Sequence, residues 1–564
     1  MTRPSEFVFE NSVGDFFTEP SDPMDERIEV GICIVGGGPA GLAAAVRIGQ
    51  LLKEQPGLAE RLGEIPVAVV EKGKGVGSHL LSGAVVNPLV FRQLFPGISV
   101  EEMPFIQPVE DEAVYYMTRK NAMRIPTPPT MWNHGNFIAS VSQMGRWLSE
   151  KAEELGIMIV PETAASKLLV SGSRIVGVRT GDKGRDREGG ELTNFEPGGD
   201  IIARATILAE GTLGHLSMAA ISKFGLRENP QVWELGVKEV WKVPKQLDRL
   251  IHTMGWPLRG GRKYREFGGS FIYPMGEDHL SLGLVIGLDY CDATVSVHDI
   301  LQEFKTHSFV REILEGGERV AWGAKTIPSG GLQSLPKRFH FPGGMIVGDA
   351  AGFVNIPALK GIHYAMRSGV LAAEAALQAI KGGSTAWRPG ALSGYDTSIR
   401  SDFIWSDLKR VRNMRPSFRN GFLAGAAISS LVTSSMGAIP PLTASIHADD
   451  ESDMFIGKRN ETYPEPDGNL TFDKLSSVYL SGNETRDDAP NHVLIRRDVP
   501  PVIAEAWINM CPAQVYALAP NSSSGESVNV EVTASNCVQC GAINAKGGRL
   551  TPPEGGDGPD YKLV

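Results

Sequence analysis

The stretch Val30-Gly-Ile-Cys-Ile-Val-Gly36-Gly-Gly38-Pro-Ala-Gly41 determines the fold that we expect for this chain. An apolar run that ends in glycine is typical of a buried parallel strand that opens into a tight turn. An alanine-rich helical stretch follows to about Leu52, and a second apolar run, 67–70, ends at Glu71. Together these segments predict a βαβ unit and an α/β fold class.

The glycines of this stretch match the G-x-G-x-x-G pattern of dinucleotide-binding proteins. Gly36 permits the tight turn, Gly38 lets the backbone approach a pyrophosphate, and Gly41 allows close packing of the helix. The helix N-terminus then directs unpaired N–H groups at the phosphates. Glu71, at the end of the second strand, is placed to accept hydrogen bonds from ribose hydroxyls. We therefore predict a dinucleotide site at this turn.

A second glycine cluster, Gly348-Asp349-Ala-Ala-Gly352, precedes another helical stretch and resembles a second flavin fingerprint. Its aspartate is suited to bind a ribityl chain, while the helix dipole faces the flavin or its phosphate. The strand at 205–208 also opens into a glycine turn at Gly211, which we assign to the cofactor site. Two separated fingerprints favour FAD over NAD. Because a flavin carries out the redox chemistry itself, no catalytic side chain is predicted.

Composition argues against several classes of protein. The 564 residues suit two or three packed domains, and a formal charge of −10 argues against nucleic acid as a partner. Five cysteines, three of them in the last 54 residues, do not resemble a secreted disulfide framework. The first 29 residues hold eight acidic side chains and two arginines, unlike a signal or transit peptide. We therefore expect a bacterial protein in a reducing compartment.

Several longer motifs follow one another from about residue 30 to the C-terminus. They are Glu71-Lys72, Gly77-Ser-His-Leu-Leu-Ser82-Gly83-Ala84, Phe267-Gly268-Gly269-Ser-Phe271, Lys360-Gly361, Tyr463-Pro-Glu-Pro-Asp-Gly468, Cys511-Pro-Ala-Gln-Val-Tyr516 and Pro553-Glu-Gly-Gly-Asp-Gly-Pro-Asp-Tyr561. Their order and content resemble the electron-transfer flavoprotein:ubiquinone oxidoreductase family, also called the ETF dehydrogenases. Each motif alone is modest, whereas their combined specificity is high.

The resemblance implies a Rossmann-like FAD-binding domain of the glutathione-reductase type, an inserted β-rich quinone domain and a C-terminal ferredoxin-like domain. In this α/β (α+β) arrangement, Lys72, Ser82, Gly83 and Gly361 join the cofactor-binding residues. We predict an N-terminal extension, a discontinuous FAD-binding domain, a quinone-binding domain, a membrane-associating segment and an iron–sulfur-type domain. Their ranges are 1–29, 30–225 with 340–400, 226–339, 401–466 and 467–564.

The resemblance further implies an enzyme that accepts electrons from reduced electron-transfer flavoprotein and reduces membrane ubiquinone or another quinone. In the family, the paired glycines of the aromatic-Gly-Gly-Ser-Phe strand contact the quinone head group, which assigns Gly268 and Gly269. Backbone without side chains leaves space for a flat ring and offers amide and carbonyl groups to its oxygens. Without the resemblance, a simple strand bulge would explain both glycines.

A membrane-binding segment is predicted between the nucleotide fold and the C-terminal domain. Residues Gly421 to Pro440 carry no charge, and basic residues suited to anionic headgroups stand just before them: Lys409, Arg410, Arg412, Arg415 and Arg419. The family uses this region as a surface that dips into one leaflet, and a buried core helix is the alternative. We expect a monotopic protein on the cytoplasmic face of a bacterial inner membrane.

The C-terminal cysteines depart from the family pattern. The family holds a [4Fe-4S] cluster with four cysteines, whereas this chain supplies Cys511, Cys537 and Cys540, with Ile543 at the fourth position. Isoleucine cannot ligate iron, and a cubane cluster normally takes one thiolate at each iron. The alternatives are a three-iron cluster, a four-iron cluster with solvent or a non-cysteine ligand, a lost cluster, or zinc with a ligand such as His492. A bound cluster is the hypothesis that we favour.

Two rival functions stay open from the sequence. A flavin-dependent reductase of isoprenoid double bonds, as in the geranylgeranyl reductase group, shares the flavin fold. A non-catalytic protein that keeps FAD for its structure is the other. The C-terminal cysteine domain and the Gly268-Gly269 strand favour the quinone reductase. Ser329 and Ile362, near the flavin, depart from the family and are placed to alter the flavin potential.

Overall fold

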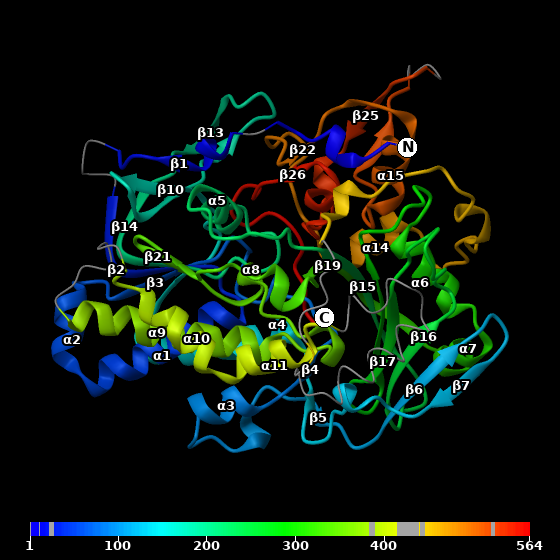
Figure 1. Cartoon of the computed structure of the whole chain (residues 1–564), viewed down its shortest axis with the longest axis horizontal. Coiled ribbons are helices and arrows are strands. Elements are labelled where there is room, and N and C mark those ends of the chain that lie inside the picture. The colour runs from blue at the N-terminus through cyan, green and yellow to red at the C-terminus, as the bar shows by residue number, and fades with distance from the viewer. Residues whose placement is uncertain are drawn as a thin grey trace.

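The structure, a computed structural model, describes residues 2–10, 12–21, 27–382, 390–413, 439, 446–520 and 525–564. Figure 1 shows two sheets side by side, with long helices along the first. The C-terminal part, drawn in orange and red, packs against the second. The predicted α/β (α+β) fold class is confirmed.

The first structural unit forms as the glycine-rich stretch predicts. Strand β2 (Arg27–Val35) leads into helix α1 (Pro39–Glu54), and β3 (Val67–Val70) lies parallel to β2. α1 begins with proline, whose missing N–H would be unpaired at this position in any case. Its buried face consists largely of alanine and glycine, so the helix axis lies close to the sheet.

β2 and β3 belong to a sheet that has nine strands among the described residues. Its main order is β1-β10-β11-β14-β2-β3-β9, with β21 beside β14 and β20 beside β21. The strands β14, β2, β3 and β9 are parallel, as expected for strands joined by helical crossovers. The other bounds are β1 Phe17–Thr18, β9 Met158–Val160, β10 Ala165–Ser171, β11 Arg174–Thr180, β14 Asp200–Leu208, β20 His340–Phe341 and β21 Gly344–Ile346.

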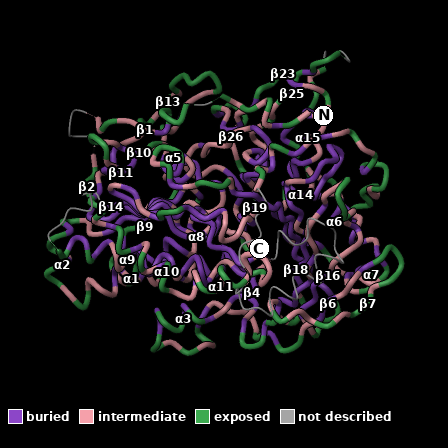
Figure 2. The backbone as a smooth tube through the Cα atoms, in the orientation of Figure 1, coloured by how far each residue is buried: buried purple, intermediate pink, exposed green. Residues whose placement is uncertain are grey.

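Two helices pack against α1, namely α9 (Ile362–Lys381) and α4 (Val141–Glu153). The contact with α9 is very close, because a Cβ added at Gly369 would lie 2.0 Å from the carbonyl oxygen of Ala40. Figure 2 shows that this region, and the strands beside it, form a continuous buried core. The remaining helices are α2 Pro56–Leu62, α3 Leu89–Leu94, α5 His215–Lys223, α6 Val297–Lys305, α7 Ser308–Leu314, α8 Gly348–Ala351, α10 Ser393–Ser401 and α11 Phe403–Val411.

The second sheet has the order β19-β15-β18-β17-β16-β6-β7. Its strands are antiparallel, except that β16 and β6 run parallel. β6 and β7 come from residues 112–125, whereas the other strands of this sheet come from residues 233–328, so the sheet joins distant parts of the chain. The predicted division of the chain into domains stays a prediction. The bounds are β6 Glu112–Met117, β7 Ala122–Ile125, β15 Trp233–Lys242, β16 Leu250–Gly255, β17 Gly268–Pro274, β18 His279–Gly287 and β19 Glu318–Pro328.

The C-terminal part contains α14 (Lys474–Leu480), α15 (Pro501–Met510) and small sheets. The N-terminal residues lie against it, since Phe9 N–H donates to the carbonyl of Gly547 (2.8 Å), and Figure 1 places the N-terminus beside α15. The shorter strands of the chain are β4 Val85–Val86, β5 Gln107–Pro108, β8 Phe137–Ile138, β12 Lys183–Arg185, β13 Glu191–Glu196, β22 Val493–Leu494, β23 Asp498–Val499, β24 Tyr516–Leu518, β25 Val528–Val532 and β26 Arg549–Leu550.

The predicted membrane segment, Gly421 to Pro440, lies outside the described residues except for Ile439, as do Arg415 and Arg419. Lys409 and Arg410 stand exposed at the end of α11, directly before this segment. Within the part of the chain that the structure describes, no helix is both long and apolar enough to cross a bilayer.

Candidate functional site

One cavity of about 990 Å³ runs between the two sheets and reaches the C-terminal part. This volume is at the upper end for small-molecule sites, which occupy about 300–1,000 Å³. Twelve of the residues predicted to bind cofactor or quinone line it: Gly36, Gly38, Glu71, Lys72, Ser82, Gly83, Gly211, Gly268, Gly269, Gly348, Asp349 and Gly361. Gly41, the three C-terminal cysteines and Ile543 do not.

The glycine turn at 36–41 has the form that a dinucleotide site requires. Gly36 has φ +107°, and a Cβ there would lie 2.4 Å from the Ala209 carbonyl oxygen. A Cβ at Gly41 would lie 2.1 Å from the Gly36 carbonyl oxygen, so this glycine serves the packing of turn against helix. A Cβ added at Gly38, by contrast, would have only a Leu80 methyl group within 4 Å, at 3.7 Å. The backbone at Gly38 faces the cavity. These features fit a bound pyrophosphate.

Glu71 holds the glycine turn from the end of β3. Its two carboxylate oxygens accept hydrogen bonds from the backbone N–H groups of Gly37 and Gly73, each at 2.8 Å. Each oxygen keeps a second lone pair, and the side chain lines the cavity. The carboxylate therefore fixes the turn and remains able to accept a ribose hydroxyl.

Asp349 lies on the opposite side of the cofactor region, in the short helix α8. Burial raises the pKa of Asp349 to about 6, and the nearby positive charge of Lys325 limits the rise. Gly348 before it has φ +62°, and its N–H donates to Ser368 Oγ (2.9 Å). A buried carboxyl group facing a cavity fits a hydroxyl-bearing ligand such as a ribityl chain, because an O–H donor would satisfy the carboxylate.

The segment 82–84 is held by a buried lysine from β15. Lys238 Nζ donates to the carbonyl oxygen of Ser82 (2.9 Å), while the N–H of Ala84 donates to Ser82 Oγ (3.2 Å). Burial lowers the pKa of Lys238 to about 7. This places a basic group beside the predicted flavin segment, where it is suited to interact with an electron-rich ring.

The predicted quinone glycines lie on β17 at the other end of the cavity. A Cβ at Gly268 would lie 1.9 Å from the Val285 carbonyl oxygen, and one at Gly269 would lie 2.7 Å from that of Thr253. The close approach of the neighbouring strands thus accounts for glycine at both positions without a ligand. Contact with a quinone stays a prediction, supported by the position of both residues in the cavity wall.

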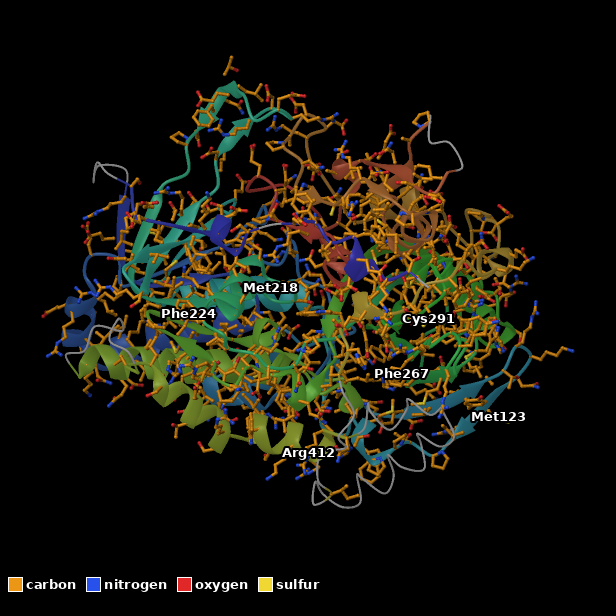
Figure 3. The ribbon with its side chains drawn as sticks, turned by 45° about the horizontal axis from the view of Figure 1, so that its top comes forward. Met123, Met218, Phe224, Phe267, Cys291 and Arg412 are labelled. Atoms are coloured by element: carbon orange, nitrogen blue, oxygen red, sulfur yellow. The ribbon has the colours of Figure 1, made fainter. Side chains whose placement is uncertain are left out.

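Beyond β17 the cavity reaches the segment after β7, where it is lined by Ile125, Pro128, Pro129 and Met131. The next residue, Trp132, is 63% exposed, and Met123 on β7 is 54% exposed. Figure 3 labels Met123 at the outer end of the β6–β7 hairpin. The apolar end of the cavity therefore adjoins exposed apolar side chains.

The three C-terminal cysteines lie near one another, since Cys511 and Cys540 raise the pKa of Cys537 and Cys511 raises that of Cys540. Backbone N–H groups point at their sulfurs: Val515 N–H donates to Cys511 and Gln539 N–H to Cys537, each at 3.4 Å. Burial raises the pKa of Cys540 to about 12 and also raises that of the other two. The thiols are free, and N–H donors of this kind are suited to metal-bound thiolates.

Ile543 fills the fourth position with hydrocarbon. It is 4% exposed, and a Cβ at Gly548 would lie 2.4 Å from its side chain and 2.9 Å from Ile495. Among the described residues, no group of three or more histidine, cysteine or acidic side chains is arranged to hold a single metal ion, which gives the zinc alternative no support. The residues therefore do not fit a cluster with four cysteine ligands, and three thiolates are what the site offers.

The cysteine loop meets the flavin side of the cavity through Gln539. Lys72 Nζ donates to its side-chain oxygen, and Lys325 Nζ donates to its carbonyl oxygen (3.1 Å). Burial lowers the pKa of both lysines, that of Lys72 to about 8. Gln539 and Gly541 line the cavity themselves, so the two ends of the molecule share one wall.

Sequence reasoning missed several polar residues of the cavity wall, above all Lys238, His252, Tyr273 and Lys325. They lie on four strands and share no local motif, so only the register of the sheet brings them together. One signal was available, because a lysine within an apolar strand such as 233–242 is rare unless it serves a site.

Two family models match the chain. The model described as "ETF-QO, ubiquinone-binding" covers residues 233–327, and the one described as "Electron transfer flavoprotein-ubiquinone oxidoreductase, 4Fe-4S" covers residues 468–562. The first includes β15 to β18 with the paired glycines, and the second includes all three C-terminal cysteines.

Curated relatives match over nearly the whole chain. The mitochondrial electron transfer flavoprotein-ubiquinone oxidoreductase of Arabidopsis thaliana is 38% identical, covering 96% of this chain and 86% of that protein. The protein of the same name from Rattus norvegicus is 36% identical, covering 94% and 89%.

Solved structures show the fold alone. A geranylgeranyl bacteriochlorophyll reductase-like protein from Thermoplasma acidophilum has a TM-score of 0.55 at 16% identity, over 75% of this chain and 95% of that one. A flavin-dependent brominase has a TM-score of 0.50 at 16% identity, over 75% and 96%.

Proposed function

Because the chain belongs to the electron transfer flavoprotein-ubiquinone oxidoreductase family, we propose that it moves electrons from reduced electron-transfer flavoprotein through FAD to a quinone. Ubiquinone or another membrane quinone is the acceptor. The enzyme is an oxidoreductase and flavoprotein whose reaction takes place on the cofactor.

The observation that carries this function is the single cavity that joins the two predicted sites. Gly38 and Asp349 of the predicted flavin site and Gly268 and Gly269 of the predicted quinone site all line this one cavity. A cavity that holds both rings would suit direct electron transfer from the flavin to the quinone. The fold shared with the reductase-like protein of Thermoplasma acidophilum favours no isoprenoid substrate, since that likeness shows only the architecture.

The chain's own residues bind and orient the cofactor. Backbone N–H groups at 36–41 would face the pyrophosphate, Glu71 would accept a hydrogen bond from the ribose and Asp349 would accept one from the ribityl chain; Gly36, Gly38, Glu71 and Asp349 all line the cavity. Lys238 presents its ammonium group, through the Ser82 contact, to the flavin side of the cavity. When bound, the flavin supplies one- and two-electron chemistry.

Reversible bleaching tests this function. The purified yellow protein is reduced with dithionite under anaerobic conditions and then mixed with a soluble quinone. We expect the flavin bands to disappear and to return on quinone addition, and the same bleaching with reduced electron-transfer flavoprotein as donor. A flavin that neither donor reduces would indicate the non-catalytic alternative, and one indifferent to quinone would contradict the proposal.

We further propose that the protein binds a membrane surface at the β6–β7 hairpin and at the basic end of α11. The apolar end of the cavity adjoins exposed Trp132 and Met123, which gives a lipid-soluble quinone a direct entry. Tryptophan is enriched at membrane interfaces, and Lys409 with Arg410 suits anionic headgroups. The curated relatives are named as mitochondrial, and the cytoplasmic face of a bacterial inner membrane is our proposed location.

Vesicle co-sedimentation tests the membrane proposal. Trp132→Ser should weaken binding to anionic vesicles several-fold, because one interfacial aromatic contributes about 1–3 kcal/mol of apolar burial. Tyr479→Ser is the matched control, since Tyr479 is an aromatic residue that is 84% exposed on α14. Equal loss in both variants would count against a specific membrane face.

For the C-terminal domain we propose a cluster bound through Cys511, Cys537 and Cys540 only. The buried thiols and the N–H donors to their sulfurs support a ligand role, and Ile543 argues against a four-cysteine site. Iron and acid-labile sulfide are to be measured in anaerobically purified protein. We expect both above background; iron at background would establish that the domain has lost its cluster.

A further inference from the structure

His252 on β16 and Tyr273 on β17 form a hydrogen-bonded pair in the cavity wall. His252 Nε2 and Tyr273 Oη are 2.8 Å apart, and the two rings meet edge to face at 77°. Both side chains are buried and line the cavity. The pairing follows from the sheet, because β16 and β17 are antiparallel neighbours with His252 opposite Phe271. A phenol bonded to an imidazole is a route along which a proton moves.

Tyr273 is near both predicted reactants. It lies on the same face of β17 as Gly269, since alternate residues of a strand share a face. The rings of Phe271 and Tyr273 are stacked at 4.6 Å between centroids. A Cβ at Gly83, in the predicted flavin segment, would lie 3.5 Å from each ring. The phenol is therefore within reach of the place where quinone and flavin would meet.

Quinone reduction consumes protons as well as electrons, because a quinone takes two of each to become the quinol. We propose that Tyr273 donates one of these protons to a quinone oxygen and that His252 restores it. This inference rests on the proposed function, in which the reduced flavin supplies the two electrons; the second proton comes from water. The phenol O–H bond breaks as the quinol O–H bond forms. The Nε2 proton of His252 then passes to the phenolate, and Nδ1 takes up a proton from water.

Burial keeps both members of the pair uncharged at rest. It lowers the pKa of His252 to about 3, with the positive Lys360 adding to the effect, and it raises the pKa of Tyr273 well above its ordinary range. A neutral imidazole can still relay, because one nitrogen takes up a proton while the other releases one. The phenol yields its proton only to a strong base, so the transfer follows the second electron, when the quinone oxygen is most basic.

Two buried lysines of the cavity wall donate hydrogen bonds to backbone carbonyls. Lys238 donates to the carbonyl oxygen of Ser82 at 2.9 Å, and Lys360 donates to that of Ala358 at 3.3 Å. Each lysine therefore has a backbone carbonyl as its hydrogen-bond partner. Tyr273, by contrast, is bonded to a second titratable side chain, His252, which can restore a proton that the phenol gives up.

Single-turnover reoxidation of the holoenzyme separates proton delivery from electron transfer. Photoreduced protein is mixed either with a short-chain ubiquinone or with ferricyanide, an acceptor that takes one electron and no proton. For Tyr273→Phe we expect reoxidation by the quinone to slow by roughly 100-fold or more, the contribution of general acid catalysis, with the ferricyanide rate nearly unchanged. His252→Gln should show the same selectivity with a smaller loss. Tyr479→Phe, which alters an exposed tyrosine on α14 outside the cavity wall, is the control and should leave both rates unchanged.

The outcomes are distinct. A Tyr273→Phe enzyme that reduces the quinone at the unaltered rate overturns the proposal, and so does an equal loss with both acceptors, which would indicate structural damage. The relay predicts a solvent deuterium isotope effect on quinone reduction by the unaltered enzyme. A change in this isotope effect in His252→Gln supports the relay. If the unaltered enzyme reduces ferricyanide but not the quinone, the proposed function fails, and the proton relay with it.

Discussion

The flavin end and the cysteine end of this molecule meet around Gln539, yet they differ in how much of the family's pattern each one keeps. At the flavin end, the predicted glycines and carboxylates of the two fingerprints line the cavity, except for Gly41 and Gly352. At the cysteine end, three thiols keep their positions and the fourth is replaced by the buried Ile543. A nucleotide site depends on backbone geometry that the whole sheet maintains, whereas a cluster site depends on individual side chains that one substitution removes.

The largest effect is expected where backbone geometry sets the flavin end. Gly41→Ala places a Cβ 2.1 Å from the Gly36 carbonyl oxygen, so the turn must shift. We expect nearly all bound flavin to be lost and the free energy of unfolding to fall by about 3 kcal/mol or more. Flavin absorbance and chemical denaturation measure both. Gly57→Ala, with no atom within 4 Å, is the control and should change stability by less than about 1 kcal/mol. If Gly41→Ala keeps its flavin, the backbone geometry of this turn does not limit flavin binding, and the contrast with the cysteine end is lost.

The second effect concerns Asp349 and depends on pH. Because burial raises its pKa to about 6, the folded flavin-free protein takes up a proton there, and its stability falls as pH rises from about 4 through 6. Asp349→Asn should therefore stabilise the flavin-free protein by about 2–3 kcal/mol at pH 8, with little change at pH 4. The same substitution should weaken flavin binding, since the ribityl acceptor is lost. If the flavin-free forms of Asp349→Asn and the unaltered protein are equally stable at pH 8, Asp349 is not a buried carboxylate with a raised pKa.

A smaller effect is expected where the two ends meet. Gln539→Ala leaves Lys72 Nζ without its side-chain acceptor in a buried place, which should cost about 2 kcal/mol. Gln514→Ala is the matched control, because Gln514 follows another cysteine, has the same φ of +52° and is exposed. Thermal unfolding of the two variants compares them. If they are equally stable, the lysine contacts do not hold the cysteine loop to the flavin end.

The smallest change in stability is expected from restoring the missing ligand. Ile543→Cys removes buried hydrocarbon and should cost about 1–2 kcal/mol. Iron content after anaerobic purification should nevertheless rise, because a fourth thiolate becomes available. Ile495→Cys loses similar packing beside Gly548 without supplying the ligand position, and should leave the iron content unchanged. Equal iron in the two variants would show that the fourth thiolate does not limit cluster binding.

The order of elements at the flavin end could be predicted from the sequence because its signals are local. The apolar run before Gly36, the helix after it and the run 67–70 became β2, α1 and β3 within a few residues. The polar wall of the cavity could not be predicted in this way. Lys238, His252, Tyr273 and Lys325 come from four strands whose neighbours are set by the register of the second sheet.

By itself, the sequence determined the fold class and the family, and it predicted the residues of the two nucleotide fingerprints, because turns, strands and helices follow from contacts between near neighbours in the chain. It also determined that the cysteine site lacks a ligand, since that is a matter of residue identity. Only the tertiary structure decided that both predicted sites share one cavity and that Gln539 ties the cysteine loop to the lysines beside it. It alone paired His252 with Tyr273. Such contacts depend on how distant strands align, and the free energy that aligns them is spread over the buried core of two sheets rather than held in any one motif.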